Sequence, residues 1–124
     1  MRQYDIRQDP PAPMMVGEIS NPGLGITQKV EAKLDSGADI TAIPDRLIDS
    51  LKLLPGGVIT VSGFDGKPEE RRTYFVAVSL NGLRIPLIEA ITTSRSHALI
   101  GRDILNGLKV VLNGKELSFD VEDP

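Results

Sequence analysis

Short runs with the pattern of β-strands, separated at close intervals by turn residues, are the feature that most constrains this fold. Residues 28–34 are the clearest run, because apolar and charged side chains alternate from Gln28 to Leu34. A period of two is typical of a strand with one buried face. Turn signals rich in Asn, Asp, Pro and Gly interrupt the chain at 21–23, 65–66, 81–82 and 113–114.

The same reading covers most of the chain and predicts an all-β domain, barrel-like or sandwich-like. Pro86 predicts an edge or a bulge in its strand, because proline cannot donate to a ladder. Short helical turns are expected from Pro44 to the break at Pro55-Gly56-Gly57, and over 102–107. Strands are expected at 14–20, 28–34, 40–43, 58–61, 72–80, 83–92, 98–100, 109–112 and 117–121.

Length and composition bound the organisation of the chain. Its 124 residues fit one domain, which we assign to 14–124. Residues 1–13 contain Pro10, Pro11 and Pro13 and predict an extended, Pro-rich N-terminal arm. The chain has no cysteine, which excludes disulfides and cysteine-based zinc sites.

The charge balance argues against several classes of partner. A net charge of −3 and a pI near 5.1 lack the broad basic surface of a nucleic-acid binder. No stretch approaches the length of a membrane span, and residues 1–13 lack the apolar run of a signal peptide. We therefore expect a cytoplasmic protein with neither a nucleic-acid nor a membrane partner.

Two segments could carry chemistry. Asp35-Ser36-Gly37 consists of ordinary turn residues, but it lies between the alternating run 28–34 and the apolar run 40–43. A carboxylate in such a turn is partly desolvated, which is how a catalytic pKa is tuned. The second segment, residues 98–105, joins a short apolar strand, Gly101 and a helical turn that begins with Arg102.

Two motifs carry the resemblance, and they are Leu34-Asp35-Ser36-Gly37-Ala38-Asp39 and Leu99-Ile100-Gly101-Arg102-Asp103-Ile104-Leu105. Together they resemble the retropepsin family, the retroviral-type aspartic peptidases and their cellular relatives. The resemblance runs from about 30 to 112 and is to a stand-alone member. It implies a closed, barrel-like acid-protease fold in a homodimer, in which each subunit supplies one catalytic Asp35. The chain has a single Asp-Ser-Gly, which agrees with a dimeric site on a twofold axis.

The resemblance also implies roles for single residues. Ser36 would bond across the axis, Gly37 would allow close approach, and Asp39 beside Ala38 would meet the substrate backbone. Gly101 would support the loop, and Arg102 would form an ion pair with Asp39. The hairpin over 61–68 corresponds to a flap that closes over an extended peptide, with Ser62, Gly63 and Phe64 as substrate contacts. The implied reaction hydrolyses peptide bonds with an activated water and uses no cofactor or metal.

Other readings stay open at this stage. His97 is the only histidine, and no Gly-x-Ser-x-Gly elbow accompanies it, as a Ser-His hydrolase would need. We expect it to be a solvated loop residue, because its neighbours Ser94, Arg95 and Ser96 predict a polar loop. The main alternative function is a homodimeric peptide-binding module with this fold and little or no activity. A purely structural β domain with a coincidental tripeptide is disfavoured by the second motif.

Overall fold

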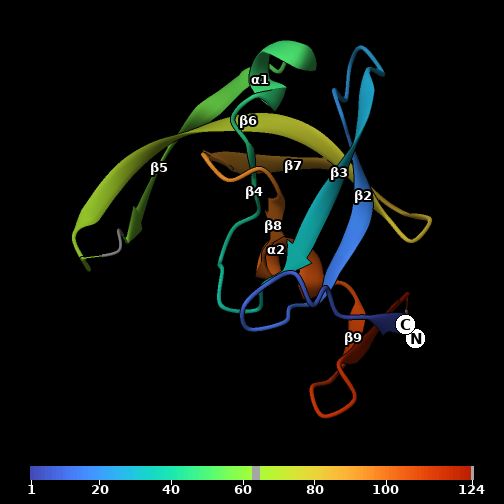
Figure 1. Cartoon of the computed structure of the whole chain (residues 1–124). Helices are drawn as coiled ribbons and strands as arrows, with labels where there is room; N and C mark the ends of the chain where they lie inside the picture. The colour runs from blue at the N-terminus through green and yellow to red at the C-terminus, as the bar shows by residue number, and fades with distance from the viewer. Residues whose placement is uncertain (63–64, 124) are drawn as a thin grey trace.

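A closed ring of strands forms the body of the protein in the computed structural model, which describes residues 1–62 and 65–123. Antiparallel pairing of the first strand of the ring, 14–20, with the longest one, 68–80, closes it, with partners from Ser20↔Ala77 to Glu18↔Ser79 (Figure 1). In order around the ring, the strands are β2 (Met14–Ser20), β3 (Thr27–Leu34), β8 (Ala98–Ile100), β4 (Ala42–Pro44), β7 (Leu83–Thr93) and β6 (Pro68–Leu80).

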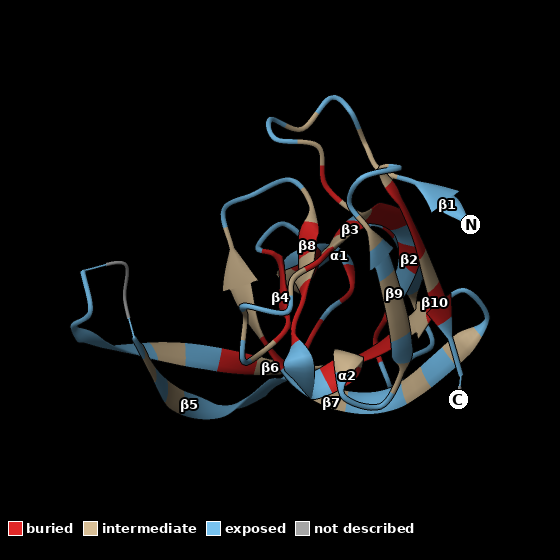
Figure 2. Ribbon diagram, turned by 90° about the horizontal axis from the view of Figure 1, so that it is seen from below, coloured by how far each residue is buried: buried red, intermediate tan, exposed pale blue. Residues whose placement is uncertain are grey.

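A long hairpin arm extends from this barrel. Strand β5 (Pro55–Ser62) pairs with the first half of β6, and the register ends at Ser62↔Pro68. Figures 1 and 2 show the arm reaching away from the body, and most of β5 is exposed. The arm therefore adds little to the core of the barrel.

A second, smaller sheet joins the two ends of the chain. Its order is β1 (Arg2–Gln3), β10 (Ser118–Glu122) and β9 (Lys109–Asn113), all antiparallel. The first strand of the chain therefore lies beside the last one, with Arg2 opposite Phe119. Among the described residues, no helix is long and apolar enough to span a membrane.

The barrel interior is aliphatic. Val30, Ala32 and Leu34 of β3 are only 3%, 2% and 6% exposed, so the predicted inward face of this strand is confirmed. Figure 2 shows buried residues concentrated inside the barrel, while the hairpin arm is mostly exposed. Burial of this apolar surface is the main favourable contribution to folding.

The predicted all-β architecture is confirmed, and so is the bulge at Pro86. Val76 pairs with Ile88 and Val78 with Ile85, so a single β6 residue lies opposite both Pro86 and Leu87. The bulge gives proline a position that needs no ladder hydrogen bond.

The predicted start and end of the first helix were wrong. Pro44 ends β4 in register with Thr93, and helix α1 covers only Leu47–Ser50. The pairing of β4 with β7 continues past Pro44, because the Asp45 N–H donates to the Thr93 carbonyl. The break predicted at Pro55-Gly56-Gly57 is instead the start of β5. Helix α2 covers Arg102–Leu105.

Candidate active site

Parallel pairing of β3 and β8 brings the two sequence motifs together. Leu34 is in register with Ile100, so both strands end at the same edge of the barrel. The Asp35 N–H donates to the Ile100 carbonyl over 2.9 Å, which joins the start of one loop to the end of the other strand. Residues 66 positions apart in the sequence thereby become neighbours, as the hydrogen bond from Arg102 to Ser36 shows.

The loop around Asp35 is folded tightly. The Asp35 Oδ1 atom accepts a hydrogen bond from the Gly37 N–H over 3.0 Å. The Ala38 N–H donates to the Asp35 carbonyl over 3.1 Å. Asp35 is half-buried, whereas Ser36 and Gly37 are exposed. The carboxylate is thus held in one orientation while the tip of the loop remains open to a partner molecule.

Arg102 bonds several residues of the same loop. Its Nη1 donates to the Ser36 carbonyl over 3.0 Å, and its backbone N–H donates to the Ala38 carbonyl over 2.8 Å. Its Nη2 donates to the Asp39 carboxylate, so these two residues form an ion pair. Because this pair is exposed, it contributes little to stability. Its effect is to fix the position of the loop.

A buried hydrogen-bond network, which sequence reasoning missed, braces the loop. The fully buried Thr41 hydroxyl donates to Asp103 Oδ1 over 2.7 Å and accepts from the Gly101 N–H over 3.1 Å. The Thr41 N–H donates to Asp103 Oδ2 over 3.0 Å. A threonine inside the apolar run 40–43 was the available signal, since a buried hydroxyl requires a partner.

Gly101 permits this close packing. A Cβ atom placed on it would lie 2.7 Å from the Ile40 carbonyl carbon and 3.0 Å from the Ala38 carbonyl oxygen. Both atoms belong to the backbone of the loop and cannot give way as a flexible side chain could. Any side chain here would push the Asp35 loop away from β8.

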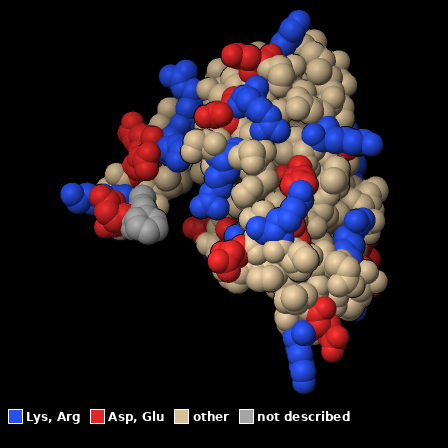
Figure 3. All heavy atoms as spheres, viewed as in Figure 1, with Lys and Arg blue, Asp and Glu red and all other residues tan. Residues whose placement is uncertain are grey.

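An open cleft of about 630 Å³ lies between the loop and the hairpin arm. The hollow is visible between arm and body in Figure 3, with charged side chains along both walls. Ser62, a predicted flap contact, lines the cleft, whereas the predicted contacts Gly63 and Phe64 lie outside the described residues. The wall next to Asp35 consists of Gly37, Ala38 and Asp39, and the apolar residues include Ala42, Ile59, Val61, Ile91 and Leu99.

His97 is not the solvated residue that we expected. Its Nε2 atom is buried and has no hydrogen-bond partner among the described residues. Burial, together with the nearby charges of Arg95 and Lys33, lowers the pKa of the imidazole. The next residue, Ala98, pairs with Ala32 of β3, which draws the segment against the barrel. Within the described ranges, no group of three metal-ligating side chains converges.

The fold and the arrangement of the two motifs define a retropepsin-like, retroviral-type aspartic protease class. The family described as gag-polyprotein putative aspartyl protease matches residues 26–107, and the chain belongs to this family. No curated protein sequence matches the chain.

Solved structures of viral and cellular proteins share the fold. The simian foamy virus (mac) protease is 19% identical, covering 76% of this chain and 92% of its own, with a TM-score of 0.57. The EIAV protease, solved with the inhibitor HBY-793, is 21% identical over 83% and 90%, with a TM-score of 0.57. The retroviral protease-like domain of Ddi1 from Leishmania major is 18% identical over 90% of both chains, with a TM-score of 0.52.

Proposed function

We propose that this protein is an aspartic endopeptidase that works as a homodimer, with Asp35 of each subunit forming the catalytic pair. The observation that carries the proposal is the braced Asp35 loop at the edge of an open cleft, in a chain of an aspartyl protease family. A rigidly held carboxylate beside a groove is what an attacking water requires.

The reaction follows from pairing two such carboxylates. Two carboxylates in contact cannot both ionise easily, so they share one proton. The ionised Asp35 takes a proton from a water molecule, while its protonated counterpart donates to the scissile carbonyl oxygen. The water attacks, a tetrahedral diol forms, and the amine leaves after protonation. None of these steps requires a metal or a cofactor.

The need for two chains follows from the single Asp-Ser-Gly in the sequence. The exposed tip formed by Ser36 and Gly37 is free to approach the same tip of a second subunit across a twofold axis. An extended polypeptide would lie in the cleft beside the hairpin arm, where the backbone of β5 near Ser62 can bond it as an added strand. The proposed substrate is therefore a polypeptide segment without secondary structure.

The test is the Asp35→Asn variant, assayed with an unstructured protein as substrate. The amide keeps the shape of the carboxylate but cannot act as the base, so we expect kcat to fall by about a thousandfold or more. The dimer, measured by sedimentation, should persist. The matched control is Asp49→Asn, because Asp49-Ser50 on α1 is exposed and lacks the following glycine. Equal cleavage by wild type and Asp35→Asn would refute the catalytic assignment.

A further inference from the structure

A second pocket adjoins the cleft on the side of β7. This outer pocket, of about 520 Å³, lies at the end of β7 and is lined in part by Asp45, Thr93 and Arg95. It shares Arg71 with the cleft described above, so Arg71 stands at the junction of one continuous groove. The other shared lining residues are Ala42, Ile91 and Leu99.

The register of the hairpin arm decides which side chains face this groove. Ile59 lies opposite Arg71, and Val61 lies opposite Glu69. Directly opposed residues of an antiparallel pair share a face, and every second residue along a strand does as well. These four side chains therefore face the cleft that they line, whereas Arg72 is on the other face of the arm.

The guanidinium group of Arg71 is incompletely used within the protein. It is half-buried, and its Nη2 donates to the Thr92 carbonyl of β7. A guanidinium has five N–H donors and forms its strongest bonds with carboxylates. Arg71 is in none of the ion pairs between described residues, which are Arg7–Asp5, Arg7–Glu31, Arg102–Asp39 and Lys109–Glu122.

We propose that Arg71 is a specificity-determining residue of this groove, which binds a substrate carboxylate while Ile59 and Val61 hold an apolar side chain. The proposal rests on the proposed peptidase function and names its substrate class. Alternate side chains of an extended peptide point the same way. The preferred segment therefore carries an aliphatic residue and, two positions away, a carboxylate from Asp, Glu or the chain terminus.

The other charges that face the groove confine this preference to one position. Glu69 lies two residues from Arg71 on the same face, and Asp45 lines the outer pocket. Asp39 is paired with Arg102, whereas Arg95 adds a second cation to the outer pocket. Since the two signs are mixed, the groove does not attract acidic peptides in general. At the junction of the two pockets, a carboxylate gains by bonding Arg71 directly.

The experiment compares matched peptides derived from a site that the wild-type protein cleaves in an unstructured protein. Each peptide carries Glu or Gln at one position near an aliphatic residue, and ends in a free carboxylate or an amide. We expect kcat/KM to be about tenfold higher with the carboxylate at one position, since a charge-assisted bond is replaced by a neutral one. Fluorescently labelled forms of these peptides should bind the Asp35→Asn variant with affinities in the same ratio.

The matched variants are Arg71→Gln and Arg72→Gln. Glutamine at 71 keeps an N–H donor for the Thr92 carbonyl but removes the positive charge, so the preference should disappear. Arg72→Gln removes the same charge from the opposite face of the arm and should keep the preference. Arg71→Glu should instead favour a peptide with Lys at that position.

An unchanged preference in Arg71→Gln would overturn the proposal, and so would an equal loss in Arg72→Gln. The Glu/Gln and acid/amide comparisons tell an internal carboxylate from a terminal one.

The binding assay separates this proposal from the peptidase proposal. Binding by Asp35→Asn that depends on Arg71, without any cleavage by the wild type, would support the former and refute the latter. If no cleavage site is found, peptides with the aliphatic and acidic residues two positions apart serve for binding.

Discussion

At the scale of single residues, the position of the Asp35 loop depends on the hydroxyl of Thr41, which belongs to neither motif. Thr41 connects Asp103 of α2 to the Gly101 N–H, next to the loop that carries Asp35. Buried polar networks of this kind are costly to interrupt, because an abandoned partner stays desolvated. Thr41 therefore links the stability of the protein to the position of Asp35.

We predict that Thr41→Val lowers the free energy of unfolding by about 1–3 kcal/mol, since an almost isosteric change leaves the Gly101 N–H without its acceptor. Urea unfolding measures the difference. Thr60→Val is the control for stability, because Thr60 is exposed on β5 and should change it by no more than about 0.5 kcal/mol. Equal effects of the two variants would contradict the bracing role of the hydroxyl.

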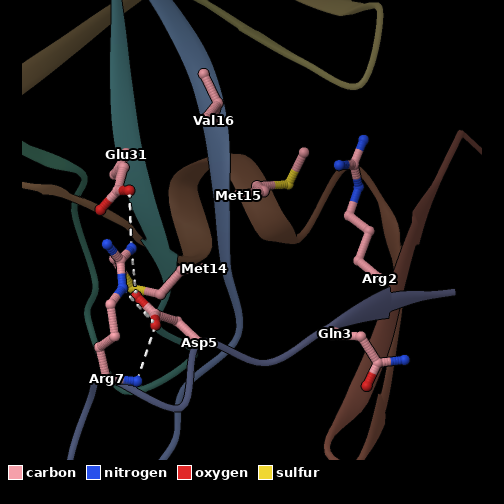
Figure 4. Close-up of a pocket in the computed structure, with 8 residues that line it drawn as sticks. All are labelled: Arg2, Gln3, Asp5, Arg7, Met14, Met15, Val16 and Glu31. Atoms are coloured by element: carbon pink, nitrogen blue, oxygen red, sulfur yellow. Dashed lines mark hydrogen bonds and ion pairs between the residues drawn. The ribbon is translucent and has the colours of Figure 1, made fainter.

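At the scale of elements, defined contacts hold the first thirteen residues together and attach them to β3 of the barrel. The Asp5 N–H donates to the Ala12 carbonyl over 2.8 Å, and Arg7 bonds both oxygens of the Asp5 carboxylate, over 2.9 and 3.0 Å. Arg7 also reaches Glu31 of β3 over 3.1 Å (Figure 4). We propose that the peptidase domain itself is 14–124 and that this segment fastens onto it.

The Asp5 contacts predict a specific pH dependence. Hydrogen bonds from the Arg7 guanidinium and the Arg7 N–H lower the pKa of Asp5 from 3.8 to about 2. A carboxyl group whose pKa is lower in the folded state stabilises the fold at pH values above its unfolded pKa. This stabilisation is lost as the pH falls through the pKa of the folded state. Wild type should therefore be more stable than Asp5→Asn at neutral pH, and the two should converge between about pH 4 and pH 2.

Denaturant unfolding across this pH range checks the prediction. Asp9→Asn removes a carboxylate from the same segment at an exposed position, and should leave the free energy of unfolding at neutral pH unchanged. A difference between wild type and Asp5→Asn that stays constant down to pH 2 would show that the contacts with Arg7 do not stabilise the ionised form.

At the scale of the whole molecule, the proposed function is incomplete in one chain. The small sheet ends at β9, which pairs with β10 alone among the described strands and exposes 52% of Leu112. A strand edge of this kind can pair with another chain. The edge and the open tip of the Asp35 loop are the surfaces on which a second subunit could complete the site.

We predict that the specific activity falls on dilution, because only dimers hold two copies of Asp35. Activity per chain is to be measured over a dilution series alongside sedimentation. An excess of Asp35→Asn should also inhibit the wild type by forming mixed dimers, whereas the same excess of Asp49→Asn should not. A fully active monomer would refute the paired site.

Much of the fold was predictable because its determinants are local. Alternation placed the buried face of β3, and Asn81-Gly82 correctly predicted the turn between β6 and β7, where both residues have positive φ. Pro86 predicted its bulge. The errors at Pro44 and Pro55-Gly56-Gly57 have a common cause, since pairing with distant strands extended β4 and β5 beyond what local preferences suggest.

The strand pattern, the two motifs and the single Asp-Ser-Gly could be recognised in the sequence, because each depends on near neighbours along the chain. The contacts between distant segments became known from the folded chain. The parallel register of β3 and β8 brings the Asp35 loop to Arg102, and Thr41 is buried against Asp103. The register of β5 with β6 turns Arg71 into the cleft. These contacts join residues far apart in sequence, so no local pattern records them.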